Sequence, residues 1–418
     1  MKLPIYLQIL LGMVVGVIVG GIALYFHAAP FINDWVKPWG QIFIRLLQLV
    51  AMPLVFVSLV KGVIGLTDIS RLSKIGMKTI AFYLITTVVA IGIGLSMAYI
   101  VKPGNFLDST KASSLIEESK TSNIVIAEKE DMGPLAFLDE IIPGNIINAA
   151  SDNRKMLQII FFAMLFGIAA LSIGREKTAP VLKLFDSLYH IILKMVDYVI
   201  MIAPFGVMAL IAGLVVDFSG DAALFGALGL YFITVVIALF IIMFVFYPTL
   251  IKLFTNIPVK KFLREMYPVQ MLAFSTSSSA ATLPLTMEVA EQKVGVSNEV
   301  CSFILPIGNT VNMDGTSCFQ TISVVFIAQV LGLDLSISQL LTIVLMTTLS
   351  SIGTPSIPGG SYVILTMVLS SVGIPAQGLA LILGVDRPLD MLRTSVNVTG
   401  DVTVAAIVDK NHTPATVN

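Results

Sequence analysis

Charged side chains are scarce in this sequence. Asp, Glu, Lys and Arg make up 12% of its 418 residues, whereas 56% of the residues are hydrophobic. A soluble domain carries about 25% charged residues and could not bury this much apolar surface, so the composition predicts an all-α polytopic membrane protein. The 25 basic and 26 acidic residues leave a net charge of −1, which excludes a basic nucleic-acid-binding protein.

Cysteine and histidine are rarer still, and their scarcity excludes several kinds of site. Cys301 and Cys318 are too few for a disulfide framework or a four-thiolate zinc site. His27, His190 and His412 lie far apart in the sequence, which argues against a histidine metal cluster. They also offer no Ser–His or Cys–His pair of the kind that activates a catalytic nucleophile.

Several apolar runs are long enough to cross a membrane, because an α-helical span needs about 20 apolar residues. They cover residues 6–26, 41–60, 79–101, 157–174, 184–216 and 224–251. A weaker apolar segment, about 133–150, precedes the fourth run. The first run follows Lys2 and resembles a signal peptide, but the many later runs favour an uncleaved first helix.

Basic residues predict the orientation of these spans. Lys and Arg gather in the loops that follow the second, fourth and sixth runs, whereas the loops on the opposite side hold few. Positive charge marks the cytoplasmic side, so we expect the N-terminus in the cytoplasm. Residues 102–132 mix both signs of charge with Ser and Thr, and we expect a flexible extracytoplasmic loop there.

A long uncharged run dominates the second half. Residues 335–385 contain no charged residue and are too many for one span. The middle, 350–361, is rich in Ser, Thr, Gly and Pro, which favour turns. The apolar arms on either side are about ten residues long, half of what a bilayer needs. This pattern predicts a re-entrant helical hairpin, with two complete spans joined by an exposed loop as the alternative.

An earlier segment, 266–287, has the same plan. Hydroxyl residues fill its centre at 275–279, and Pro268 and Pro284 flank them. One ordinary span would fit the length, but consecutive hydroxyls at mid-depth favour a second re-entrant tip. Each hairpin is followed by an apolar helix that polar residues interrupt, and this repeated unit is typical of a transporter with a site near the membrane midplane.

Polar side chains recur every three or four residues in the last apolar segment, and therefore share one face of a helix. They are Asp386, Asp390, Arg393, Asn397 and Asp401. Ionisable groups inside a span are costly and are functional by default. The alternative is that these groups only form structural ion pairs with an arginine. For Asp386 taken alone, this alternative explains the residue as well as a functional role does.

The same residue types indicate what could bind. Arg393 offers a planar fork for a carboxylate, and Asp390, one turn earlier, suits an ammonium group. A ligand with both groups would satisfy this pair, which Arg387 and Thr394 flank. Hard oxygen donors suit alkali cations rather than soft metals. The sequence supplies such donors at Asn312, Asp314, Asn397 and Asp401.

Several motifs together resemble one known family. They are the serine-rich run 275–279 with Thr-Leu-Pro at 282–284, Asn-Met-Asp-Gly-Thr at 312–316, and the segments 390–394 and 397–401. These motifs are similar to those of the glutamate transporter family, the dicarboxylate/amino acid:cation symporters, which include archaeal aspartate transporters and animal excitatory amino acid transporters. The likeness runs from the first span to residue 408.

The resemblance implies a fold of eight transmembrane helices plus two re-entrant hairpins, built as inverted repeats. It also implies a homotrimer in the lipid of the cell membrane, with both termini in the cytoplasm, and an elevator mechanism. A scaffold would comprise 1–75 (spans one and two) and 103–222 (the extracytoplasmic loop with spans four and five). The moving transport domain would comprise 76–102 (span three) and 223–418 (span six, both hairpins, and spans seven and eight).

Substrate contacts are implied in the same way. Arg393 would bind the side-chain carboxylate of the substrate and Asp390 its amino group, with Asp386 and Arg387 as auxiliary charges. Asn397 and the hairpin tip would hold the α-carboxylate. The implied substrate-binding residues are Ser277, Ser278, Ser279, Thr316, Thr354, Asp390, Arg393, Thr394 and Asn397.

The family also implies three sodium sites and no organic cofactor. The first would use Asp401 and Asn397 with backbone carbonyls at Gly308 and Asn312. The second would use Thr310 with carbonyls at Ser351, Ile352 and Thr354. The third would use Tyr83, Thr86, Thr87, Asn312 and Asp314. The residues by themselves reveal the carboxylates but not the number of ions.

Comparison within the family sharpens the expected coupling. Proton-coupled bacterial members commonly carry Asn where this chain has Asp401, so sodium is favoured. Gln320 replaces a glutamate of potassium-countertransporting animal members. Arg393 and Asp390 are both present, which favours an acidic amino acid. We therefore expect sodium-coupled uptake of L-aspartate or L-glutamate, with a proton-coupled acidic amino acid or C4-dicarboxylate symporter as the alternative.

The chain departs from the family pattern at several positions. Ser277 stands where archaeal members carry an arginine, and Arg387 is placed as in the animal branch. The second hairpin tip contains Pro355 and Ser356, and Asn309 replaces a usual alanine. Because proline fixes φ and removes a donor, Pro355 could stiffen the gate.

Two other classes of protein were weighed. The polar stripe could line a channel, but two re-entrant gates argue against an always-open path. Asp386 and Asp390 could form the aspartyl pair of an intramembrane enzyme. However, Arg387 and Arg393 on the same helix would keep both carboxylates ionised, so we expect no enzyme.

Overall fold

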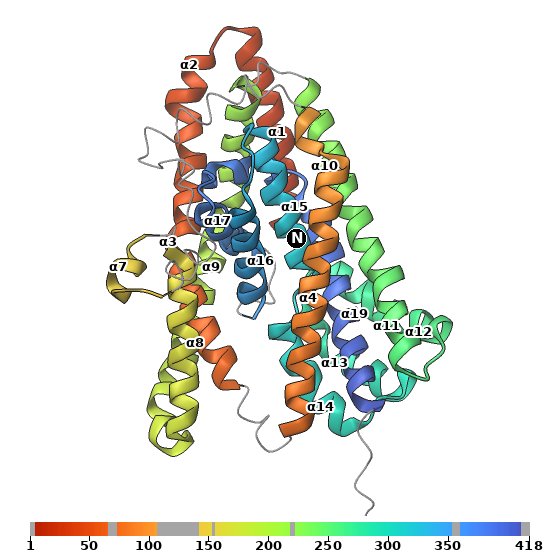
Figure 1. The fold of residues 1–418 in the computed structure, drawn as a ribbon. Coiled ribbons are helices and arrows are strands. Elements are labelled where there is room, and N and C mark those ends of the chain that lie inside the picture. The colour runs from red at the N-terminus through yellow and green to blue at the C-terminus, as the bar shows by residue number, and fades with distance from the viewer. Residues whose placement is uncertain are drawn as a thin grey trace, which may run out of the picture.

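The computed structural model describes residues 5–65, 73–106, 142–152, 155–217, 222–352 and 360–410. Within these ranges the regular structure is entirely helical, which confirms the predicted all-α class. The helices form an elongated bundle (Figure 1). Those long and apolar enough to cross a membrane cover Leu7–Tyr25, Ala29–Lys61, Gly76–Asn105, Glu176–Asp217 and Phe225–Phe254.

Each apolar run predicted from the sequence is a helix. The helices are α1 (Ile5–Tyr25), α3 (Lys37–Gly65), α4 (Ser73–Val101), α8 (Met156–Ile173), α9 (Arg175–Asp217) and α10 (Ala222–Ile241), which continues through η6 (Ile242–Phe246) into α11 (Tyr247–Phe254). Several are longer than predicted because polar ends join the apolar run. Short elements α2 (Ala29–Phe31) and η1 (Ile32–Val36) lead into α3, η3 (Pro103–Phe106) follows α4, and α7 (Ile146–Ala150) precedes α8. The weak segment 133–150 lies largely outside the described residues, as does most of the loop 102–132.

The N-terminal helices pack closely because small residues line their contacts. Gly12, Gly16 and Gly20 on α1 face α9, and a Cβ at any of them would collide with a backbone carbonyl of α9. Such contacts let helix backbones approach each other in a membrane. A buried ion pair, Lys37 Nζ to Asp217 Oδ2 at 2.8 Å, joins the start of α3 to the end of α9. Helix α3 packs against both α8 and α9.

The first predicted hairpin is present as two packed helices, α12 (Val259–Thr276) and α13 (Ser279–Val289). The chain reverses at Ser277, which has a left-handed φ of 50°. The Ser278 side chain then caps α13 by accepting a hydrogen bond from the backbone N–H of Ala281 at 3.2 Å. The element η7 (Ala290–Val294) leads to α14 (Asn298–Val311).

The second hairpin has arms α16 (Ile337–Ser351, 15 residues) and α17 (Gly360–Ser371, 12 residues), which contact each other. At about 1.5 Å per residue these arms reach about 22 and 18 Å, short of the about 30 Å of a hydrocarbon core. Re-entrance of this hairpin stays a prediction, with which the length of the arms is compatible. Residues Thr354, Pro355 and Ser356 of the tip lie outside the described residues.

Each hairpin is followed by the predicted polar element. After the first, α14 ends at Val311, Asn312 adopts an extended conformation, and α15 (Asp314–Val330) begins. After the second, η8 (Ala376–Leu379) and α18 (Ala380–Leu383) precede the long helix α19 (Asp386–Lys410). The predicted stripe of α19 faces the interior, but most of the other residues of the helix are buried too, including Val398 and Thr403. Helix α19 is therefore central, in contact with α4, α10, α11, α12, α14 and α15.

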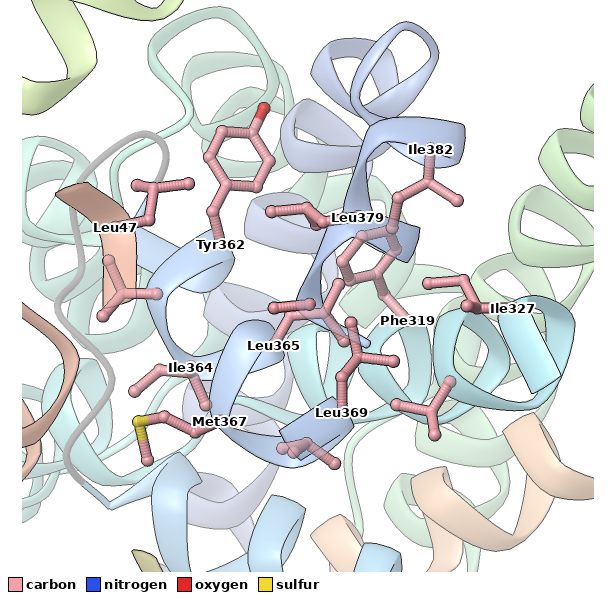
Figure 2. Packing of buried hydrophobic residues seen from close by; sticks show 14 of the residues in the cluster. Leu47, Phe319, Ile327, Tyr362, Ile364, Leu365, Met367, Leu369, Leu379 and Ile382 are labelled. Atoms are coloured by element: carbon pink, nitrogen blue, oxygen red, sulfur yellow. The ribbon is translucent and has the colours of Figure 1, made fainter. Parts of the chain in front are cut away.

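Helix α17 is held in place by an apolar cluster. Figure 2 shows Leu365 and Leu369 of α17 beside Phe319 of α15 and Leu379 of η8. All four side chains are fully buried. Phe319 also lies against Arg393 of α19, so this apolar cluster adjoins the charged residues of that helix.

Candidate functional site

Two pairs of opposite charges occupy the first turns of α19. Arg393 lies between two carboxylates, with Nη1 3.0 Å from Asp386 Oδ1 and Nη2 2.8 Å from Asp390 Oδ1. Arg387 Nη1 lies 3.2 Å from the other oxygen of Asp390. Asp386, Asp390 and Arg393 are buried. The charges of this cluster cancel, which lowers the cost of keeping them in the interior.

Arg393 retains capacity for a further acceptor. Its side chain is 1% exposed, its Nε atom has no hydrogen-bond acceptor in the described structure, and Nη1 is close to Asp386 Oδ1 without the geometry of a hydrogen bond. The guanidinium plane lies over the Phe319 ring, with Cζ 3.8 Å from the ring centre, so one face of the group is held by cation–π contact. A buried guanidinium with unused donors is suited to binding a carboxylate.

Helices α15 and α19 meet next to this cluster. Asn397 Oδ1 accepts a hydrogen bond from the backbone N–H of Gly315 at 2.8 Å, and its Nδ2 donates to Thr316 Oγ1 at 3.3 Å. A Cβ on Gly315 would collide with the backbone of Arg393. The Thr394 hydroxyl donates to the carbonyl of Asp390 at 2.8 Å. The structure thus brings Thr316, Asp390, Arg393, Thr394 and Asn397 together.

The serine tip is anchored to α19 through its first arm. Ser395 Oγ donates to the carbonyl of Gln270 at 2.9 Å, and Gln270 Nε2 donates to Thr399 Oγ1 at 3.1 Å. At the tip, Ser277 and Ser279 are buried, and the Ser277 hydroxyl has no hydrogen-bond partner in the described structure. A buried hydroxyl without a partner is costly, so the tip offers an unused polar group.

A first buried carboxylate, Asp401, lies at the junction of α14 and α19. Asn312 Nδ2 donates to Asp401 Oδ1 at 2.9 Å, while Asn312 Oδ1 has no hydrogen-bond donor in the described structure. Gly308 faces this group, and a Cβ there would collide with the Tyr83 hydroxyl and with Asp401 Oδ1. Only glycine leaves room for these oxygens to converge.

A second buried carboxylate, Asp314, begins α15. Thr87 Oγ1 donates to its Oδ1 at 2.7 Å, and the Tyr247 hydroxyl donates to its Oδ2 at 2.9 Å. Thr86, also predicted to lie here, donates to the carbonyl of Tyr83 at 3.1 Å. Within the described residues neither Asp314 nor Asp401 forms an ion pair with Lys, Arg or His. Carboxylate, hydroxyl and amide oxygens of this kind suit a hard monovalent cation.

The second predicted ion site, with Thr310 and the end of α16, is only partly described. Ser351 Oγ at the end of α16 lies 3.4 Å from the carbonyl of Val311 at the end of α14. Thr310 stands on the last turn of α14, where its hydroxyl donates to the carbonyl of Ile307 at 2.9 Å. Ile352 caps α16, and Thr354 lies beyond the described residues. The two helix ends meet as the prediction requires, and the ligand set stays a prediction.

The structure adds residues that the sequence did not single out. Tyr247 donates a hydrogen bond to Asp314, and Phe319 stacks on Arg393. Each is an aromatic residue within a helix, where a tyrosine or phenylalanine gives no signal of its own. Their roles arise from contacts between helices that are distant in the sequence.

Long apolar helices, two helical hairpins, and ionisable groups buried between helices are together consistent with a multi-pass membrane transport protein. A family model, the sodium:dicarboxylate symporter family, matches residues 5–411. The chain belongs to this family, which consists of transporters, and this confirms the resemblance to the glutamate transporters.

Similar proteins cover nearly the whole chain. The proton/sodium-glutamate symport protein of Bacillus subtilis (strain 168) is 38% identical over 412 residues, which are 98% of this chain and 93% of that protein. The proton/glutamate-aspartate symporter of Escherichia coli (strain K12) is 34% identical over 414 residues, covering 98% of this chain and 94% of that protein. Excitatory amino acid transporter 3 of Oryctolagus cuniculus is 31% identical over 444 residues, covering 96% of this chain and 83% of that protein.

Proposed function

We propose that this protein is a sodium-coupled symporter of acidic amino acids, L-aspartate or L-glutamate. The observation that carries the proposal is the fully buried Arg393, which keeps unused donors beside the carboxylate of Asp390. An acidic amino acid brings a carboxylate for the first group and an ammonium for the second. The relatives are named as symporters of glutamate or of glutamate and aspartate, which supports acidic amino acid symport.

In this proposal the substrate lies between α19, α15 and the first hairpin. Arg393 binds its side-chain carboxylate with charge-assisted hydrogen bonds, and Asp390 binds its amino group. Asn397 and the serines 277–279 hold the α-carboxylate, for which the Ser277 hydroxyl has an unused donor. Thr316 and Thr394 line the pocket.

Sodium is proposed as the coupling ion because two buried carboxylates have no cationic partner among the residues that the structure describes. Asp314 and Asp401 are each buried, and an uncompensated buried carboxylate is strongly disfavoured. Sodium ions arriving with the substrate would supply the missing positive charge. Proton coupling is the second candidate, favoured by the names of relatives that combine protons with glutamate.

We further propose an elevator mechanism and a homotrimer. Helices α1, α3, α8 and α9 pack on one another, which fits a scaffold, whereas α12–α15 surround α19, which fits a transport domain. Large apolar side chains remain exposed along α9, among them Ile191, Tyr198 and Phe205. Lipid or another copy of the chain would cover them, because the exposed face is too apolar for water.

Calorimetric binding to the detergent-purified protein tests the proposed function. We would titrate L-aspartate, L-glutamate, L-serine and succinate in sodium buffer and again with choline in place of sodium. The expected result is binding of an acidic amino acid in sodium only, with far weaker binding of serine and succinate. Equal affinity in both buffers would move the coupling to protons. Preferential succinate binding would contradict the proposed substrate.

A further inference from the structure

Five aromatic residues are exposed where the chain passes from α1 through α2 and η1 into α3. Each has between 59% and 80% of its surface exposed, and we call them the aromatic patch: Tyr25, Phe26, Phe31, Trp35 and Trp39. Both tryptophans of the sequence belong to it. The rings of Tyr25 and Phe26 contact each other edge to face, with centres 5.1 Å apart. Helix α2 lies at one end of the elongated bundle (Figure 1).

The helical segment that carries three of these rings is packed against protein on its opposite side. Phe31, Trp35 and Trp39 are spaced four residues apart and therefore share one side. On the other side, Ile32 is buried in an apolar cluster with residues of α1 and α9. Lys37 is buried in its ion pair with Asp217 of α9. The aromatic side is thus exposed because the segment presents it outward.

Two features of this region exclude the hydrocarbon core of a bilayer. Asp34, between Phe31 and Trp35, is exposed, and an ionised carboxylate that faces lipid chains is costly. The backbone also leaves the helical path at residues 26–28, where the exposed His27 has a left-handed φ of 53°. Irregular backbone that faces lipid does not occur within the hydrocarbon region. The patch therefore lies at or outside the edge of the hydrocarbon.

Exposed aliphatic side chains limit the position of the patch from the other direction. Along the two spans that lead away from it, such side chains are found on α1 at Leu11, Ile18 and Ile22, and on α3 at Ile42 and Leu49. The patch is thus the place where an exposed aliphatic surface gives way to polar residues. Trp and Tyr are enriched at such a membrane boundary, because their rings are apolar and their N–H or O–H groups form hydrogen bonds.

Lipid suits this composition better than a second copy of the chain or water. The core of a protein–protein interface is depleted in charged residues, whereas Asp34 stands within the patch and is exposed. Water alone would leave a large aromatic surface uncovered. The headgroup layer of a bilayer accommodates both the rings and the carboxylate, because it is apolar on one side and hydrated on the other.

We propose that the aromatic patch binds the interfacial layer of a phospholipid bilayer, with the rings of Trp35 and Trp39 at the level of the glycerol and headgroups. The patch holds the adjoining ends of α1 and α3 at a fixed depth. This inference goes beyond the proposed function and depends only on the multi-pass membrane class of the chain. A failure to bind acidic amino acids would therefore leave it standing.

Native tryptophan fluorescence tests the proposal, because the sequence contains no tryptophan outside the patch. The full chain would be reconstituted into phosphatidylcholine vesicles whose lipids carry bromine either near the glycerol or near the chain ends. We expect the shallow bromine to quench the fluorescence at least about two-fold more than the deep bromine. Trp35→Phe and Trp39→Phe, each of which leaves one tryptophan, should show the same order for each ring.

Ile18→Trp, in a chain that also carries Trp35→Phe and Trp39→Phe, is the matched control. Ile18 is exposed on α1, seven residues before Tyr25, which places it about 10 Å deeper along the helix axis. The deep bromine should therefore quench this tryptophan more than the shallow one. Stronger quenching by the shallow bromine here too would overturn the proposal, because the patch would then lie beyond the headgroups.

Two further results in the native chain would also overturn the proposal. Quenching by aqueous iodide, with no effect of either brominated lipid, would place the rings in water. Protection from iodide and from both lipids would show that another copy, or another part of the chain, covers the patch.

Discussion

The two halves of the molecule bury different chemistry. In the N-terminal helices α1, α3, α8 and α9 the interior is almost wholly apolar, and glycines on α1 set the closest contacts. Around α15 and α19, hydroxyls, amides and carboxylates are buried side by side. The first arrangement stabilises a packed shape. The second keeps polar groups away from water at a cost in stability, which indicates that they are retained for binding.

The largest effect on binding is expected from a substitution of Arg393, in the polar half. Replacing it by cysteine leaves Asp386 and Asp390 without their shared cation and removes the fork for a carboxylate. We expect affinity for acidic amino acids to fall by at least about a hundred-fold, measured as uptake into proteoliposomes. Arg264→Cys is the control, because Arg264 is an exposed arginine that pairs with its own neighbour Glu265. Equal loss in both variants would contradict a role specific to Arg393.

A second test concerns the uncompensated carboxylates. Asp401→Asn removes a buried negative charge beside Asn312. The factor by which sodium increases substrate affinity should therefore be at least about ten-fold smaller than in the wild type. The measurement is aspartate affinity as a function of sodium concentration. Asp409→Asn is matched to it, since Asp409 lies further along the same helix, near its exposed end, and accepts a hydrogen bond from Ser297 Oγ. An identical sodium response in Asp401→Asn would remove this carboxylate from the coupling.

The apolar half should respond in stability and not in binding. A Cβ on Gly16 would meet the carbonyl of Met208 and the side chain of Ile211, so Gly16→Ala should cost about 1–3 kcal/mol. Thermal unfolding in detergent would show the loss, with aspartate affinity unchanged in the folded protein. Gly21→Ala is the matched control, because open space surrounds that position. A loss of stability in Gly21→Ala as large as in Gly16→Ala would contradict the close-packing argument.

The smallest effect is expected at an exposed charge of the same half. Lys61 Nζ lies 2.7 Å from Asp186 Oδ1 and 4.3 Å from the centre of the Tyr189 ring, but its side chain is 40% exposed. Lys61→Gln should change the free energy of unfolding by no more than about 1 kcal/mol. Lys37→Gln, at the buried pair with Asp217, should cost more, about 3 kcal/mol. A larger loss of stability in Lys61→Gln than in Lys37→Gln, measured by thermal unfolding, would show that burial does not determine how much these ion pairs stabilise the protein.

Much of this organisation could be predicted from the sequence. Apolar runs indicated the helices, and hydroxyl-rich interruptions indicated the hairpins, because both signals are local. The spacing of Asp390, Arg393 and Asn397 indicated one polar face. The aromatic partners could not be predicted, since Tyr247 and Phe319 contact residues on helices that are distant in the sequence. Nor did spacing reveal that α19 would be buried along most of its length.

The uneven balance of charge has an electrical consequence. Around Arg393 the charges cancel, whereas Asp314 and Asp401 each leave a buried negative charge when ionised. A charge that crosses the membrane potential gains or loses about 2.3 kcal/mol per 100 mV. The membrane potential would therefore change the free energy of moving a transport domain that returns without ions. It would have little effect on a domain whose bound ions neutralise these carboxylates. The membrane potential would thus act on whichever step moves the uncompensated carboxylates.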